Sequence, residues 1–223
     1  RQLVINMDPP EHLRFRRVIK DAFTGRAVDR IDGVMRDFAK SIIDRVAPDG
    51  YCDFAQQVAA EMPLFVICNL VDMPLDRRKT FSELVTTMIG MDDPELCLSE
   101  EDGQMAAAEL FGIAMELAEN CRKNPNRGTL IHTLINGNVD GEALTEFEFC
   151  TFFLILIAGA VETTRTATSQ GMRLLIEHPE QHKLLIEKPE LIEGAIEEIL
   201  RFYPPFIFMQ RTAVEDIVIG EMD

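Results

Sequence analysis

The most constraining feature of the sequence is a charge-free apolar run over residues 149–161, which is followed directly by Glu162, Thr163 and Thr164. A transmembrane helix needs roughly 20 apolar residues, so this run has the length of a buried core helix. Buried polar groups must be hydrogen-bonded or used chemically. An acid and two hydroxyls at the end of a core segment therefore need a structural or functional explanation.

A single long helix is expected around this run. Thr145 and Glu148 have the spacing of a capping box, in which the hydroxyl and the carboxylate satisfy free backbone N–H groups at a helix start. The next helix terminator is His178-Pro179. A helix over residues 145–177 would be about 50 Å long at 1.5 Å per residue, enough to run through a domain.

Composition narrows the class of protein. The chain has 223 residues, 47% of them hydrophobic, and a mean hydropathy of +0.01, so it can bury a sizeable core. Its net charge of −16 argues against nucleic acid and anionic membrane surfaces as partners. Five cysteines without a CxxC pair or zinc spacing favour reduced thiols in the cytoplasm. Residues 1–6 have no signal-peptide character, and we expect no membrane anchor; residue 1 is not Met and is not the expected natural start.

Helical periodicity and terminator signals predict a mainly α fold. Asp8 is the expected N-cap of the first helix, with Pro9 and Pro10 in its first turn. Helices are expected at residues 8–23, 26–46, 55–71, 77–89, 103–123, 129–135, 145–177, 179–186 and 189–203, with an acidic loop over 92–102. Short strands are expected at 51–54, 206–213 and 216–219, and Asn-Gly and Asp-Gly signals indicate a hairpin-type turn within 136–141.

Small residues lie beside the polar break of the long helix. Gly159 and Thr163 are i, i+4 neighbours, so one helix face offers almost no bulk next to a hydroxyl. A Thr hydroxyl bonded to the carbonyl four residues earlier can open or bend a helix, and the pair would form a notch for a flat ligand. The alternative is structural: Thr163 is satisfied by its own helix and Glu162 reaches the surface.

Two further charge patterns are weak when taken alone. The first helix carries the densest basic cluster of an acidic protein, with His12, Arg16 and Lys20 on one face, and a solvated helix face is the simplest interpretation. Glu198 and Arg201 form an i, i+3 pair of a very common kind. The acidic loop is flanked by four methionines that could form an adaptable lid over a lipophilic ligand, although plain core packing is the favoured explanation: Met88, Met91, Met105 and Met115.

Four motifs in order give these patterns a context. Asp8-Pro-Pro-Glu-His12-x-x-x-Arg16, Gly159-Ala-Val-Glu-Thr-Thr164, Glu198-x-x-Arg201 and Arg211-Thr-Ala resemble the cytochrome P450 family of haem-thiolate monooxygenases, and the bacterial soluble type most of all. The resemblance covers essentially the whole chain. It implies the central part of the P450 fold, a long central helix surrounded by helices with a few short strands. It also implies one domain over residues 1–223, incomplete at both ends.

The resemblance implies a role for each motif. Gly159 and Thr163 would border an oxygen groove over haem b, and Glu162 with Thr163 would relay protons to dioxygen there. The haem propionates would accept hydrogen bonds from His12, Arg16 and Arg211. Glu198 and Arg201 would be a structural pair. The implied pocket for a lipophilic substrate such as a terpenoid, steroid or fatty acid has these residues: Val85, Met88, Ile155, Gly159, Phe206, Ile207 and Phe208.

The implied electron donor is a ferredoxin with its reductase, and Arg17 and Lys20 could face such an acidic partner.

The sequence departs from the family pattern in two places. Ala160 stands where a second glycine is usual, and no segment of the sequence resembles the Gly-rich, Phe-containing cysteine loop that would supply the iron ligand. We expect that loop after residue 223, in a longer monooxygenase. The alternative is a non-catalytic helical ligand-binding or interaction module, because a chain without the thiolate lacks the group that drives O–O cleavage.

Overall fold

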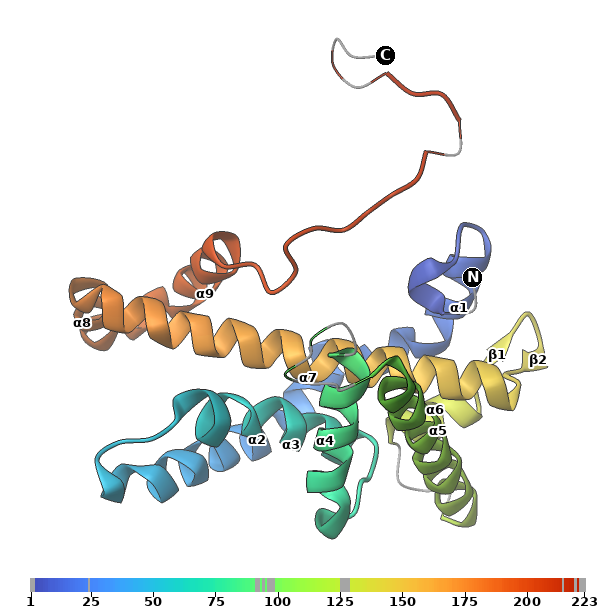
Figure 1. Ribbon diagram of the computed structural model, residues 1–223, viewed down its shortest axis with the longest axis horizontal. Coiled ribbons are helices and arrows are strands. Elements are labelled where there is room, and N and C mark those ends of the chain that lie inside the picture. The colour runs from blue at the N-terminus through green and yellow to red at the C-terminus, as the bar shows by residue number, and fades with distance from the viewer. Residues whose placement is uncertain are drawn as a thin grey trace. The chain divides into compact units, whose positions relative to one another are not determined.

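The computed structural model describes residues 3–23, 25–90, 93, 95, 99–124, 129–213, 215–218 and 220. These residues are mostly helical and include two short antiparallel strands, which confirms the predicted mainly α fold. The chain divides into two compact units, Arg1–Ser169 and Gln170–Asp223. Helix α7, Glu146–Glu177, is continuous and contributes residues to both units (Figure 1). A single domain over residues 1–223 stays a prediction.

The first unit is a helical assembly with one hairpin. Its longer elements are α1 (Glu11–Ile19), α2 (Gly25–Val46), α3 (Glu61–Leu70), α4 (Arg78–Ile89), α5 (Glu100–Lys123), α6 (Leu130–Ile135), β1 (Asn138–Val139), β2 (Glu142–Ala143) and the first part of α7. Short 3-10 helices lie at Val4–Asn6, Lys20–Phe23, Ala47–Asp49 and Leu75–Arg77, and a π-helix at Ala55–Ala59. The second unit has the end of α7, α8 (Pro179–Glu187), a 3-10 helix (Pro189–Leu191) and α9 (Ile192–Phe202).

The starts of α7 and α1 show whether the helix caps predicted from the sequence are present. The predicted capping box is present: the Thr145 hydroxyl accepts the Glu148 N–H at 3.2 Å, and the Glu148 carboxylate accepts the Thr145 N–H at 2.8 Å. The predicted N-cap at Asp8 is wrong, since α1 begins at Glu11 without a side-chain cap. Pro10 stands in the N-cap position of α1, and its side chain has no oxygen that could accept a free helical N–H.

The hairpin follows from its turn residues. β1 and β2 pair antiparallel, with Asn138 opposite Ala143 and Val139 opposite Glu142. Asp140 and Gly141 have φ angles of 54° and 94°, the left-handed backbone that an Asp-Gly turn provides. The predicted hairpin signal is therefore confirmed.

The other strand predictions are wrong for the residues that the structure describes. Residues 51–53, 204–213 and 215–218 form no strand, and Phe54 already has helical backbone. A strand is stabilised by pairing with a neighbour, and β-propensity mostly reflects that packing. No such neighbour lies beside these described segments, and Ile207 is 92% exposed. Residue 219, much of the predicted acidic loop and residues 125–128 lie outside the described residues.

The core of the first unit is built on one stripe of α7. Six of its side chains are at most 4% exposed: Phe149, Cys150, Phe152, Phe153, Ile157 and Val161. Phe15 of α1 and Phe81 of α4 pack against this stripe, each with its ring centroid 6.3 Å from that of a phenylalanine of α7. α7 is long and apolar enough to cross a membrane, but a core helix of a globular unit meets the same criteria of length and composition. The apolar stripe of α7 forms the core of the first unit.

Candidate functional site

The polar break lies on an unbroken part of α7. The Thr163 hydroxyl donates a hydrogen bond to the Gly159 carbonyl at 2.8 Å, and the helix continues on both sides of this pair. A Cβ added at Gly159 would meet no atom within 4 Å, so open space lies beside the glycine. Gly159 is exposed, and Thr163 is satisfied by its own helix, as the structural alternative predicted for this residue. A ligand notch at this pair stays a prediction.

Glu162 is held between two helices and does not simply reach the surface. Its Oε1 accepts a hydrogen bond from the Thr86 hydroxyl of α4 at 3.3 Å, and its Oε2 lies 3.5 Å from Nη1 of Arg165. The side chains of Glu162 and Arg165 are 26% and 24% exposed. Both contacts are at the long end of the hydrogen-bond range, which makes them weak. The carboxylate is thus placed by contacts that it can leave at low cost.

A groove joins α1 to the same helix. It has a volume of about 630 Å³ and is lined by Leu13, Arg16, Arg17, Ile19, Lys20, Phe23 and Leu156. Leu156 precedes Gly159 by three positions, so the two lie on the same side of α7. The structure therefore brings Arg16 to the groove that Leu156 of α7 lines, and a joint site of Arg16 with Gly159 stays a prediction.

The cations of α1 differ in whether they are paired. Arg14 pairs with Asp140 at 2.6 Å, across to the hairpin. Among the described residues, no ion pair or hydrogen bond of the side chain is found for His12, Arg16 or Lys20. Unpaired cations above an apolar groove fit a ligand that has both carboxylates and a large apolar face, such as haem.

The remaining predicted haem contact and the structural pair lie in the second unit. Glu198 and Arg201 on α9 are joined by two hydrogen bonds of 2.7 Å, and this guanidinium lowers the pKa of the Glu198 carboxyl. Arg211 is exposed in the extended segment after α9, where its side chain donates to the Gln210 carbonyl at 2.8 Å. A joint site of Arg211 with α1 stays a prediction.

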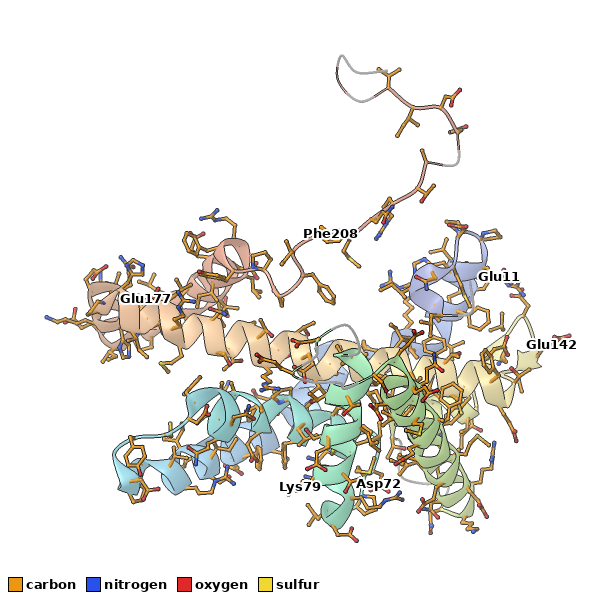
Figure 2. All side chains as sticks on the ribbon, viewed as in Figure 1. Glu11, Asp72, Lys79, Glu142, Glu177 and Phe208 are labelled. Atoms are coloured by element: carbon orange, nitrogen blue, oxygen red, sulfur yellow. The ribbon has the colours of Figure 1, made fainter. Side chains whose placement is uncertain are left out.

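The predicted substrate residues also fall in both units. In the first unit Val85 is fully buried in the core, and Met88 and Ile155 pack against that core half-buried. In the second unit Phe206, Ile207 and Phe208 are exposed on the segment after α9, where Figure 2 shows Phe208. Their shared pocket stays a prediction.

The cysteines of the described residues differ in burial. Burial raises the pKa of the Cys68 thiol to about 11, although nearby Arg78 opposes the shift, and burial followed by the charge of Glu146 raises the pKa of Cys150. Both side chains are packed in the apolar core of the first unit, at 0% and 3% exposed, so neither is open to a cofactor in this structure.

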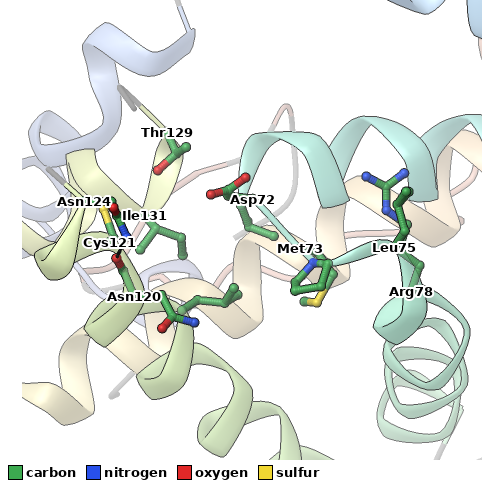
Figure 3. A pocket seen from close by; sticks show the side chains of 12 residues that line it. Asp72, Met73, Leu75, Arg78, Asn120, Cys121, Asn124, Thr129 and Ile131 are labelled. Atoms are coloured by element: carbon green, nitrogen blue, oxygen red, sulfur yellow. Dashed lines mark hydrogen bonds between the residues drawn. The ribbon is translucent and has the colours of Figure 1, made fainter. Parts of the chain in front are cut away.

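A separate cavity of about 470 Å³ lies away from this site, between the turn after α3, the end of α5 and the start of α6 (Figure 3). Asp72 and Met73 enter it from the turn, Asn120 and Cys121 from α5, and Thr129 from just before α6. It contains none of the residues predicted to be functional.

Two residues of the site were not predicted from the sequence. Arg165 is three positions after Glu162, and this spacing alone indicates a contact on a helix. Thr86 lies 76 positions before Glu162, and nothing in the local sequence indicates that they meet.

Comparison with known proteins places this arrangement in a family. No protein-family model matches the chain. A steroid C26-monooxygenase of Mycolicibacterium smegmatis is 36% identical over 220 residues, which are 99% of this chain and 50% of that protein. The corresponding enzyme of Mycobacterium tuberculosis is 38% identical, with 97% and 49% covered, and its methyl-branched lipid omega-hydroxylase is 31% identical, with 96% and 51% covered.

Solved structures agree with these relatives. The structure of P450BioI with an acyl carrier protein bearing hexadec-9Z-enoic acid matches 98% of this chain and covers 56% of its own, with a TM-score of 0.88 and 28% identity. A Mycobacterium marinum cytochrome P450 in complex with pseudoionone matches 90% of this chain and 49% of its own, with a TM-score of 0.83 and 29% identity. The fold and these matches thus define the class, a mainly α protein of the cytochrome P450 type. The chain belongs to the cytochrome P450 family, and it spans about half the length of the curated relatives it matches.

Proposed function

We propose that this chain forms part of a cytoplasmic haem-dependent monooxygenase that hydroxylates a lipophilic small molecule with O2. The observation that carries the proposal is the acid and alcohol at 162 and 163, placed beside the exposed Gly159 and directly after the part of α7 that forms the apolar core. The relatives named for steroid and methyl-branched lipid oxidation support a steroid or branched lipid as the substrate class.

The expected cofactor is haem b. When bound, it supplies the activation of dioxygen that no protein side chain can perform. His12 and Arg16 would hold its propionates from α1, with Arg211 as a third donor. The unpaired state of the α1 cations and the space beside Gly159 support this assignment.

The proton path would use Glu162 and Thr163 in sequence. The O–H bond of the protonated Glu162 would break as its proton passes to the Thr163 oxygen, directly or through a water, and the O–H bond of Thr163 would break as its proton passes to dioxygen in the proposed groove. Partial exposure lets the carboxylate regain a proton from solvent water. Thr163 must first release the Gly159 carbonyl, to which it donates at 2.8 Å.

Electrons would come from a ferredoxin and its reductase. The exposed cations Arg17 and Lys20 of α1 and the following 3-10 helix offer a positive face in a chain of charge −16, which suits an acidic donor. Raising the ionic strength should slow electron transfer if this surface is used.

A carbon monoxide difference spectrum of the reduced whole protein tests the proposal. We expect the absorption of thiolate-ligated haem, together with an oxygenated product from a steroid or a branched fatty acid when reductant is supplied. A whole protein that is folded and haem-free, or that holds haem without a thiolate ligand, would refute the proposed activity.

A further inference from the structure

One contact of the site is not explained by the functions assigned so far. Thr86 of α4 donates to Oε1 of Glu162 at 3.3 Å, and the second carboxylate oxygen lies 3.5 Å from Arg165. The Arg165 contact is internal to α7, while the Thr86 contact joins α7 to another helix. The acid of the proposed proton path is therefore attached to α4 by a single hydroxyl.

The position of Thr86 on α4 gives this contact its meaning. Val85 and Met88, two of the predicted substrate residues, lie within one turn of Thr86. Val85 is fully buried, so its displacement needs movement of the local helix, whereas the flexible, half-buried Met88 can also change rotamer. A ligand that displaces this turn of α4 would also move the hydroxyl that holds Glu162.

We propose that Thr86 is a positioning residue that links substrate contact on α4 to proton delivery by Glu162; this rests on the function proposed above. Without substrate, Thr86 and Arg165 hold the carboxylate away from Thr163. Displacement of the α4 turn stretches a bond that is already long at 3.3 Å and frees the carboxylate to turn towards Thr163. Because hydrogen bonds weaken with length, a small helix shift is enough.

The contact itself is tested without any turnover. In the substrate-free protein, the infrared carboxylate band of Glu162 is identified as the band lost in Glu162→Gln. We expect Thr86→Val to shift this band, because the carboxylate loses a hydrogen-bond donor, and Thr86→Ser to keep it in place. Thr87→Val is the matched control, since Thr87 is the adjacent, equally half-buried threonine and donates no hydrogen bond to Glu162. Equal bands in Thr86→Val and Thr87→Val would overturn the proposal.

The link to catalysis is tested by a double-mutant cycle in the haem-loaded whole protein. We expect Thr86→Val to lower several-fold the product formed per reducing equivalent and to change the solvent isotope effect, while Thr86→Ser and Thr87→Val behave as the wild type. In the Glu162→Gln background Thr86→Val should have no further effect, because it acts through that acid. An additive effect in that background would contradict a positioning role.

The cycle separates the two proposals. If Glu162→Gln leaves the product yield unchanged, the proton path under the proposed function fails, whatever Thr86 does. If Glu162→Gln lowers the yield but Thr86→Val matches Thr87→Val, the path stands and the role of Thr86 fails. Should Thr86→Val not fold, Thr86→Ala replaces it and the same comparisons apply.

Discussion

At the scale of single residues, hydrogen-bond length separates fixed side chains from movable ones. Glu148 accepts at 2.8 Å from the backbone N–H of Thr145, and this bond anchors the start of α7. Glu162, on the same helix, has contacts of 3.3 and 3.5 Å. The first carboxylate is a structural cap, and the second has the loose placement that a proton carrier needs if it is to turn between solvent and an acceptor.

Cys68 gives a prediction about pH. Its folded-state pKa of about 11 lies above the reference value of 9.0, so the folded protein holds the thiol proton more tightly than the unfolded chain. The stabilisation this brings is complete below pH 9 and is lost as the pH rises towards 11. We expect the free energy of unfolding to fall by up to about 2 kcal/mol more in the wild type than in Cys68→Ala over this interval, measured by urea denaturation.

Cys52→Ala is the control for this measurement, because Cys52 is only partly buried. It should keep the alkaline loss of stability seen in the wild type. If Cys68→Ala loses stability between pH 9 and 11 as steeply as Cys52→Ala, the buried thiol does not titrate as described.

At the scale of elements, the sequence predicted those features of the fold that depend on residues close together in the chain. The capping box, the apolar stripe and the Asp140-Gly141 turn each act within a few positions, and α7 and the hairpin form as expected. The segment over 206–213 was predicted as a strand, and a strand depends on a partner that the local sequence cannot supply. The contact of Thr86 with Glu162 was missed for the same reason, whereas Arg165 was within reach of helix spacing.

The capping box of α7 gives a prediction at this scale. Thr145→Ala removes the hydroxyl that accepts the Glu148 N–H, and an N-cap of this kind contributes about 1 kcal/mol. We expect a loss of this size in the free energy of unfolding, measured by denaturant titration. Thr164→Ala on the exposed face of the same helix should change stability by only a few tenths of that amount. Equal losses in both variants would show that the cap contributes nothing specific.

At the scale of the whole molecule, charge and binding are linked. A chain of net charge −16 repels an anionic cofactor unless local cations oppose the overall field. Arg16 has no ion-pair partner among the described residues, and it lines the groove between α1 and Leu156 of α7. Arg16→Ala should therefore weaken haem binding by the whole protein, read by competitive transfer of haem to apomyoglobin, because a charge-assisted hydrogen bond is lost.

Arg14→Ala provides the comparison, since Arg14 is engaged with Asp140 in an ion pair to the hairpin. It should affect stability more than haem affinity. A haem affinity that Arg14→Ala lowers as much as Arg16→Ala would mean that α1 contributes to the site through its fold and not through a free cation.

The central claim is that the polar break of α7 delivers protons in an oxygenation reaction. Its most direct test measures the oxygenated product and the hydrogen peroxide formed per reducing equivalent, and takes the ratio of the two. The measurement is made on the whole protein with Thr163→Ala and with Thr164→Ala. The account predicts that Thr163→Ala diverts most reducing equivalents to peroxide, while Thr164→Ala, one position along and exposed, retains the ratio of the wild type. An unchanged ratio in Thr163→Ala would contradict the account.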